Sequence, residues 1–195
     1  MQPVPDPPED GEPWPGDTVT PVEGVIIPFV APPMAVHYSS ADDDWHTPWP
    51  VLDVAVGLLG EIDLDPCADN DRKVPAACHY TEAQDGLSQD WRGRVWMNPP
   101  YGRVIGDWVE KLCSEHDAGN VTEALALVPA RTDTEWWNRF DAAAICFIRG
   151  RLHFSNSDNA APFPSALVYL GSRPDAFAAA YGGIGRVWIP WRNAG

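Results

Sequence analysis

The sequence predicts an α/β fold in which a mainly parallel sheet carries helices on both of its faces. Short apolar segments that end at glycine or proline alternate along the chain with longer segments whose apolar residues recur at helical spacing. Polar residues follow directly after several of the short segments, which is where sheets of this class hold their ligands. With 195 residues, of which 45% are hydrophobic, the chain is long enough to form one such domain.

The first part of the chain differs in composition from the rest. Residues 1–33 hold ten of the 21 prolines and no lysine or arginine. Such a segment buries little apolar surface, so we expect residues 1–41 to form an acidic, flexible tail and residues 42–195 to form the folded domain. The apolar run Val25–Val30 either docks as a short strand or remains an exposed part of the tail.

The net charge of −15 limits the ways in which this chain can contact nucleic acid. Nine of the 28 acidic residues lie in residues 1–44, but the remaining residues still carry a net charge of −6. Any contact with nucleic-acid phosphates must therefore use a local basic patch and not the overall charge.

The sequence also bears on compartment and metal content. No segment reaches the roughly 18 apolar residues of a membrane span, and the N-terminus has no signal segment, so we expect a cytoplasmic protein. None of the four cysteines forms a CxxC pair, and the spacings Cys78-His79 and Cys113-x-x-His116 have no second half. We therefore predict reduced, mostly buried thiols and no metal site.

The domain begins with a helix and two strands. Thr47 can cap a helix that starts at Pro48, and an apolar stripe at helical spacing continues to Gly60. Alternation of apolar and acidic residues predicts a strand at residues 61–66, and residues 77–81 form a plausible second strand.

The next elements surround a short apolar segment, Val95–Met97, which reads as a strand because two prolines then end it. Apolar residues at helical spacing predict an amphipathic helix at residues 103–117, in which Trp108 packs against the core. Residues 124–128 form a buried strand, and Thr132-x-x-Glu135 matches a capping box that opens the following helix.

The last third of the domain completes the sheet. Trp188 is predicted to be a packing residue of the final strand. The remaining predicted elements are strands at residues 143–148, 166–170 and 186–189 and a short helix at residues 175–181.

The segment Asn98-Pro99-Pro100-Tyr101 carries the strongest chemical signal. The prolines fix φ and lack N–H groups, so the turn presents carbonyl oxygens without competing donors. Two acceptors, the Asn98 side-chain oxygen and the Pro99 main-chain oxygen, can take both N–H hydrogens of a conjugated exocyclic amine and free its lone pair. A planar base can stack on Tyr101, so that positioning and aimed dipoles supply the catalysis.

These residues resemble a known family. Asn-Pro-Pro-Tyr is motif IV of the S-adenosylmethionine (SAM)-dependent amino-methyltransferases. Over residues 45–170, four further segments occur in the order found in bacteriophage-type DNA N-6-adenine methyltransferases: Trp45-His46-Thr47-Pro48, Asp63-Leu64-Asp65-Pro66-Cys67-Ala68, Asp85-Gly86-Leu87-Ser88-Gln89-Asp90-Trp91 and Pro129-Ala130-Arg131-Thr132-Asp133-Thr134. The resemblance implies a Rossmann-like SAM-dependent methyltransferase fold with one antiparallel strand near its end.

The resemblance also implies a cofactor site. The residues that it assigns to SAM are Trp45, Thr47, Pro48, Asp65, Pro66, Cys67 and Asp85. Asp65 would face the methionine ammonium group, and its alternative role is to cap a helix. Glu82, Asp85 and Asp90 can each hold the ribose or adenine of SAM, and the family's motif spacing favours Asp85.

Three arginines are candidates for contact with DNA. Arg131 follows a predicted strand and can bind phosphate, orient the acidic loops or form a plain surface ion pair. Arg149 and Arg151 form the densest basic segment of the chain, and Phe163 follows; in the family this region lies near the target base. The alternative is a basic hairpin that only offsets the acidic surface.

The function implied by the resemblance is transfer of a methyl group from SAM to the exocyclic N6 amine of adenine in DNA, without a metal. If a phage encodes the chain, it acts in the cytoplasm of a bacterial host. Alternatives are an amino-methyltransferase acting on cytosine N4, RNA or protein glutamine, and a catalytically silent acidic protein that binds a basic partner. No separate target-recognition domain is evident, so no recognition sequence is predicted.

Overall fold

The computed structural model of the chain describes residue 47, residues 49–153 and residues 161–190, all within one compact unit. The predicted tail of residues 1–41, with Val25–Val30, lies outside the described residues. So do Trp45 and Pro48, two of the residues that the resemblance assigns to SAM.

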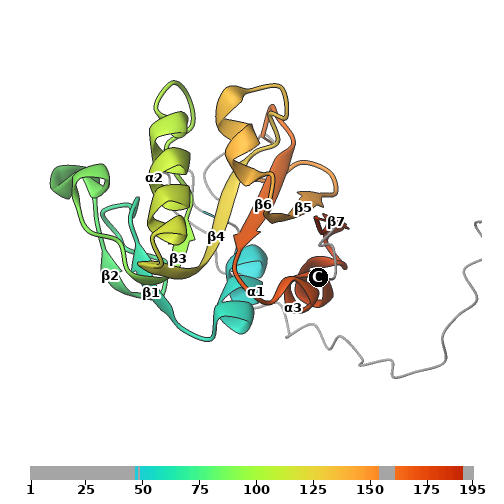
Figure 1. The fold of residues 1–195 in the computed structure, drawn as a ribbon, viewed down its shortest axis with the longest axis horizontal. Helices are drawn as coiled ribbons and strands as arrows, with labels where there is room; N and C mark the ends of the chain where they lie inside the picture. Colours follow the sequence, from blue (N-terminus) through green and yellow to red (C-terminus); the bar gives the residue numbers. More distant parts are fainter. Residues whose placement is uncertain (1–46, 48, 154–160, 191–195) are drawn as a thin grey trace, which may run out of the picture. The chain divides into compact units, whose positions relative to one another are not determined.

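The described residues form a seven-stranded mixed sheet, which Figure 1 shows in the order β2-β1-β3-β4-β6-β5-β7. The strands are β1 (Ile62–Asp65), β2 (Ala76–His79), β3 (Gly93–Met97), β4 (Val121–Pro129), β5 (Ala144–Ile148), β6 (Ser165–Leu170) and β7 (Gly185–Trp188). Strands β1 to β4 are mutually parallel. The predicted α/β class and the mainly parallel first part of the sheet are thus confirmed.

The second part of the sheet differs from the prediction of one antiparallel strand. β6 pairs antiparallel with both β4 and β5, and β7 pairs antiparallel with β5. Two strands, β6 and β7, are therefore reversed. The connection between them explains why β7 shares the direction of β6: helix α3 carries the chain back to the edge of the sheet where β6 began, and β7 then joins the far side of β5.

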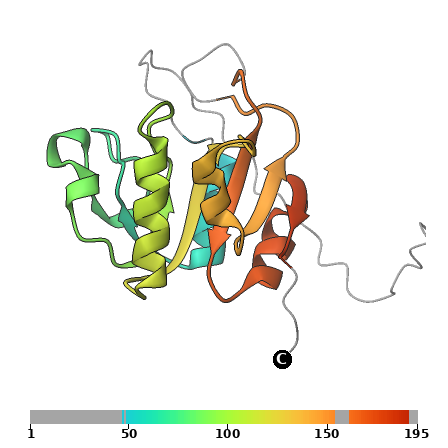
Figure 2. The same ribbon diagram turned by 45° about the horizontal axis from the view of Figure 1, so that its top comes forward.

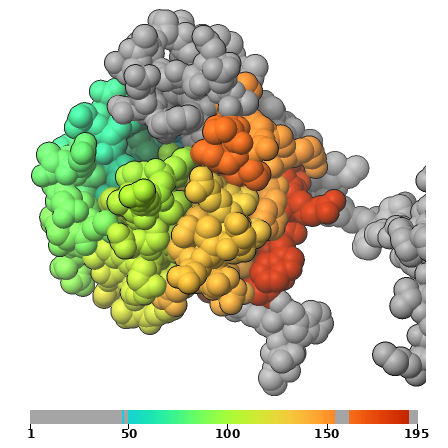
Figure 3. Space-filling view, turned by 90° about the horizontal axis from the view of Figure 1, so that it is seen from above, coloured from blue at the N-terminus to red at the C-terminus, as the bar shows by residue number. Residues whose placement is uncertain are grey.

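Helices cover both faces of the sheet, as predicted. Helix α2 (Ile105–Asp117) and the 3-10 helix η3 (Glu135–Phe140) pack on one face, and Figure 3 shows these two segments side by side at the surface. Helices α1 (Trp49–Leu59) and α3 (Pro174–Tyr181) pack on the other face, and Figure 2 shows α1 behind the sheet. Two further 3-10 turns, η1 (Glu82–Gln84) and η2 (Gly86–Ser88), follow β2.

Three local predictions can be compared with the structure. Trp108 of α2 is buried and stacks on Trp91 with 5.9 Å between ring centroids, which confirms its packing role. Trp188 is 48% exposed on the edge strand β7, so its predicted packing role is wrong. The capping box at Thr132 is also wrong, because Thr134 precedes η3 and its hydroxyl donates to the Arg131 carbonyl instead.

The strand directions place the predicted site residues along one edge of the sheet. The carboxyl ends of the parallel strands β1, β3 and β4 meet at this edge, which we call the site edge. The reversed strand β6 begins there, since Pro129 is the register partner of Ser165. Residues that follow β1, β3, β4 and β5, and residues that precede β6, are therefore gathered at the site edge.

Candidate active site

The centre of the site is the side-chain amide of Asn98, which lies between two hydroxyl groups. Asn98 follows the buried Met97 at the end of β3, and the prolines stop the strand at this point. Its Nδ2 donates a hydrogen bond of 3.3 Å to the Thr47 hydroxyl, and its Oδ1 accepts one of 2.8 Å from the Tyr101 hydroxyl. The amide is thus held from both ends, with its oxygen on the Tyr101 side.

The ring of Tyr101 packs edge-on against Phe163, with 5.3 Å between centroids and 83° between the ring planes. Phe163 lies two residues before β6, so the site-edge segment before this strand reaches the Asn98 turn. Burial raises the pKa of the Tyr101 phenol, and the nearby Cys67 adds to this effect. Tyr101 therefore keeps its proton and remains a hydrogen-bond donor to Asn98.

Asp65 ends β1 as a buried carboxyl group that is only 3% exposed. Burial, helped by the nearby Asp69, raises its pKa to about 7, although the Cys67 main-chain N–H donates to Asp65 at 3.2 Å and opposes the shift. Among the described residues no basic side chain forms an ion pair with it. The alternative that Asp65 caps a helix is wrong, because a turn and then β2 follow.

Cys67 joins the end of β1 to the Asn98 turn. The main chain of Asn98 lies close enough to the Cys67 sulfur to oppose the rise in the pKa of the thiol. Burial, followed by the adjacent Asp65, raises the pKa of the Cys67 thiol well above its ordinary value. The thiol is therefore neutral, so Cys67 acts as a packing and hydrogen-bonding group and not as a nucleophile.

The Asp85 turn packs directly on the turn that follows β1. A Cβ atom at the adjacent Gly86 would lie 1.9 Å from the Pro66 carbonyl oxygen, so only glycine allows this approach. Asp85 itself has φ of 49°, in the left-handed region, and its side chain is exposed. Asp90 instead forms an ion pair of 3.6 Å with Arg92. The approach of Gly86 to Pro66 places the Asp85 turn against the segment that follows Asp65.

The arginines at one edge of the sheet form ion pairs, whereas those at the site edge form none with the described residues. Three arginines at the edge opposite the site form short ion pairs: Arg94 with Asp63 at 2.9 Å, Arg139 with Glu110 at 2.8 Å and Arg173 with Glu123 at 2.6 Å. Arg131, Arg149 and Arg151 follow β4 and β5 at the site edge and are exposed. Within the described part of the chain they form no ion pair, so the surface ion pair considered for Arg131 has no partner there.

Sequence analysis missed two features of the site. Arg103 follows the Asn98 turn, is exposed, and forms no ion pair with any residue that the structure describes. Its position next to the Asn98-Pro99-Pro100-Tyr101 segment is visible in the sequence and makes it a further candidate. The contact between Thr47 and Asn98 has no such signal, because the two residues are 51 positions apart.

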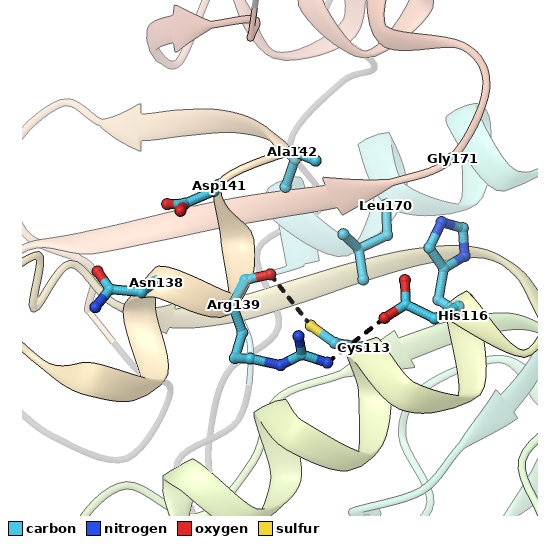
Figure 4. A pocket seen from close by; sticks show the side chains of 10 residues that line it. Cys113, His116, Asn138, Arg139, Asp141, Ala142, Leu170 and Gly171 are labelled. Carbon is cyan, nitrogen blue, oxygen red and sulfur yellow. Dashed lines mark hydrogen bonds and ion pairs between the residues drawn. The ribbon is translucent and has the colours of Figure 1, made fainter.

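A cleft of about 380 Å³ lies at the opposite edge of the sheet, between the end of α2 and the start of β5. Figure 4 shows Arg139 in this cleft beside Cys113, whose thiol donates to the Arg139 carbonyl oxygen at 3.6 Å. The Arg139 guanidinium also pairs with Asp117 at 3.5 Å. These polar groups satisfy one another, and none of them belongs to a predicted site. The cleft is therefore separate from the site edge.

The described residues contain neither a metal-binding cluster nor a membrane-spanning helix. No group of three or more His, Cys, Asp or Glu side chains is arranged to hold a metal ion. No described helix is both long enough and apolar enough to cross a membrane.

The comparison with protein families decides the classification. The family model of DNA N-6-adenine-methyltransferase (Dam) matches residues 36–166, more than half of the chain. The chain belongs to the Dam family. A search of curated proteins found no match.

The matched region of this Dam-family chain contains every proposed site residue. It extends from the segment before α1 to the beginning of β6, and so includes the Asn98 turn and the whole site edge through Phe163. The mixed sheet with helices on both faces is compatible with a Rossmann-like methyltransferase fold. Membership of the family supports DNA adenine methylation as the general activity.

Proposed function

We propose that this Dam-family chain transfers a methyl group from SAM to the N6 amine of adenine in DNA, with Asn98 as the central catalytic residue. The observation that carries the proposal is the fixed Asn98 amide at the site edge, whose oxygen already accepts a hydrogen bond of 2.8 Å. An amide oxygen held in this way acts as an aimed dipole that needs no reorganisation when the substrate arrives.

Asn98 and Pro99 prepare the amine for reaction. The adenine N6 lone pair is delocalised into the purine ring, which makes the amine a poor nucleophile. The Asn98 Oδ1 and the Pro99 carbonyl oxygen would each accept one N–H hydrogen and draw the nitrogen toward tetrahedral geometry. Because Oδ1 has two lone pairs, it can accept from the amine while it still accepts from Tyr101. The nitrogen would form the new N–C bond as the bond between the methyl carbon and the sulfonium sulfur breaks, S-adenosylhomocysteine would leave, and the nitrogen would lose one proton to solvent.

The residues around Asp65 fit the cationic end of SAM. SAM, when bound, supplies the electrophilic methyl group. A buried carboxyl with a pKa of about 7 and no basic partner among the described residues is suited to an ammonium group, which would favour its ionised form. Pro66 and Cys67 would complete this part of the site. Asp85, on the turn that packs against Pro66, would accept hydrogen bonds from the ribose or the adenine.

Tyr101 and the arginines of the site edge would hold the DNA. An adenine in a duplex must leave the base stack before its amine can reach Asn98. The Tyr101 ring, supported by Phe163, offers a stacking surface for that base. Arg103, Arg131, Arg149 and Arg151 are exposed near this surface and would contact phosphates despite the acidic overall charge.

Identification of the product nucleoside tests the proposal. The full chain is incubated with tritiated SAM and unmethylated DNA, and the labelled nucleosides are separated and weighed by mass spectrometry. We expect N6-methyldeoxyadenosine. A label on deoxycytidine would move the activity to another amino-methyltransferase class, as would labelling of RNA or of a protein glutamine when these replace DNA in parallel reactions. The absence of SAM binding by calorimetry would favour a silent binding protein.

A further inference from the structure

The hydrogen bond between Thr47 and Asn98 connects the segment before α1 to the catalytic turn. Thr47 is half-buried, and its hydroxyl oxygen accepts from the Asn98 Nδ2 at 3.3 Å. Sequence analysis gives Thr47 two other roles, as a helix cap and as a contact of SAM. In the structure, the Thr47 hydroxyl contacts the Asn98 amide, on which the proposed chemistry depends.

The direction of this amide matters, because its two ends have opposite hydrogen-bonding character. The oxygen accepts, whereas the nitrogen can only donate. If the Asn98 amide were turned by about half a rotation, its NH₂ group would face the NH₂ group of the target adenine, and two donors cannot bond to one another. Catalysis by Asn98 therefore requires that its nitrogen be held away from the substrate.

We propose that Thr47 is a positioning residue, whose hydroxyl holds the Asn98 nitrogen so that Oδ1 faces the target amine. The inference rests on the proposed function, because it concerns the same reaction. Either hydroxyl could also bond to the turned amide, so the two hydroxyls fix the plane of the amide and not its direction. The target amine acts as a donor and therefore selects the direction in which Oδ1 faces it, and Thr47 then pairs the nitrogen that this direction turns away from the substrate.

This role predicts a specific kinetic result. Thr47 acts through Asn98, so removal of its hydroxyl should lower kcat while the affinity for SAM stays the same. A Thr47 that contacted mainly the cofactor would show the reverse, with weaker SAM binding and a normal kcat at saturating SAM. The two roles are thus separable by calorimetry and single-turnover kinetics on the same variants.

The test uses four variants of the full chain. Thr47→Val removes the hydroxyl at nearly constant volume, and Thr47→Ala serves as a second deletion if the valine disturbs folding. Thr47→Ser keeps the hydroxyl and should restore the rate to within about threefold of wild type. The matched control is Thr122→Val, because Thr122 is exposed on β4 at the opposite edge of the sheet and should behave as wild type.

We expect Thr47→Val to lower kcat about fivefold to fiftyfold, the effect of leaving one buried hydrogen-bonding group unpaired. Its dissociation constant for SAM should stay within about twofold of wild type. A kcat equal to that of Thr122→Val would overturn the inference, as would a loss confined to SAM affinity. If the wild-type chain forms no N6-methyladenine, the proposed function fails and the inference falls with it.

A double-mutant cycle shows whether Thr47 acts through Asn98. Asn98→Ala removes the whole amide, including the Nδ2 that Thr47 contacts. In that background Thr47→Val should add less than about a twofold loss, because the contact is already gone. If Thr47→Val costs as much there as in the wild type, Thr47 contributes independently of Asn98 and the positioning role is refuted.

Discussion

The Tyr101 hydroxyl donates a hydrogen bond of 2.8 Å to the side-chain oxygen of Asn98. The ring proposed to stack on the target base is thereby tied to the amide proposed to hold its amine. The stacking role predicted from the sequence involves only the ring of Tyr101, so on that basis Tyr101→Phe would leave kcat/KM nearly unchanged. The observed contact changes this expectation, because the phenylalanine ring would leave one of the Asn98 contacts unmade.

Two substitutions separate the ring of Tyr101 from its hydroxyl. Tyr101→Phe keeps the stacking surface and removes one hydrogen bond, so kcat/KM should fall about twofold to tenfold. Tyr101→Ala also removes the stacking surface, which is worth roughly 1–3 kcal/mol per base, and should lose about ten- to a hundredfold. Steady-state kinetics on one DNA substrate measures both. Equal losses in the two variants would mean that stacking contributes little.

A mismatch opposite the target adenine provides the control for stacking. Less pairing energy is then needed to bring the base out of the helix. The loss caused by Tyr101→Ala should therefore shrink on mismatched DNA, whereas the loss caused by Tyr101→Phe should stay the same. A Tyr101→Ala defect that is unchanged on mismatched DNA would argue against a stacked, extruded base.

SAM affinity should depend on pH through Asp65. The pKa of Asp65 is raised to about 7 in the protein without ligand, so the carboxyl is mostly protonated at pH 6 and mostly ionised at pH 8. A cationic ammonium group favours the ionised form, so affinity should fall by about tenfold as pH is lowered from 8 to 6. Calorimetry at the two pH values measures this change. Asp65→Asn should bind SAM weakly with little dependence on pH, and a wild-type affinity that is flat with pH would contradict the role.

The choice of Asp85 over its acidic neighbours can be tested by three alanine variants. Asp85→Ala should weaken SAM binding, because its turn packs on Pro66 beside Asp65. Glu82→Ala and Asp90→Ala serve as matched controls, since they remove equally exposed acids of the same segment and Asp90 is already paired with Arg92. Calorimetry on the folded variants measures their affinity for SAM and shows which acid contributes to it. Unchanged affinity in Asp85→Ala, with a loss in one control, would transfer the role to that residue.

The arginines of the site edge should act as phosphate contacts. Arg103→Ala, Arg149→Ala and Arg151→Ala should each weaken DNA binding by a similar factor on unrelated sequences. Each should also reduce the slope of log affinity against log salt concentration by about 0.9. Arg92→Ala, at an exposed position just before β3 and therefore at the opposite edge of the sheet, is the control for a loss of one positive charge. A loss confined to one DNA sequence would indicate a base contact instead.

Much of the fold could be predicted because apolar periodicity reports local burial. The stripe of α2 and the alternation in β1 identified these elements to within a few residues. The direction of β7 and the exposure of Trp188 could not be predicted, because both depend on which strand pairs with which. Strand pairing is a long-range property, and hydrophobic pattern alone does not encode it.

In the candidate site, too, residues in short segments could be predicted, whereas contacts between residues distant in the sequence could not. The Asn98 turn and the strand-end acids Asp65 and Asp85 were identified from short segments whose chemistry is local. The hydroxyl pair around Asn98 was not, because Thr47 comes from a segment 51 residues away and the Tyr101 contact depends on a side-chain rotamer. The sequence therefore points to Asn98 as the proposed catalytic group, and the structure adds the two hydroxyl groups that contact its amide.

The most direct measurement of the central claim compares wild type with Asn98→Ala in two assays. Single-turnover transfer from tritiated SAM to DNA reports the chemistry, and calorimetry reports SAM binding. The variant should bind SAM within a few-fold of wild type and lose about 10²–10³ in rate, the usual effect of removing one aimed catalytic dipole. Turnover within about threefold of wild type, with N6-methyladenine still formed, would contradict the assignment of Asn98.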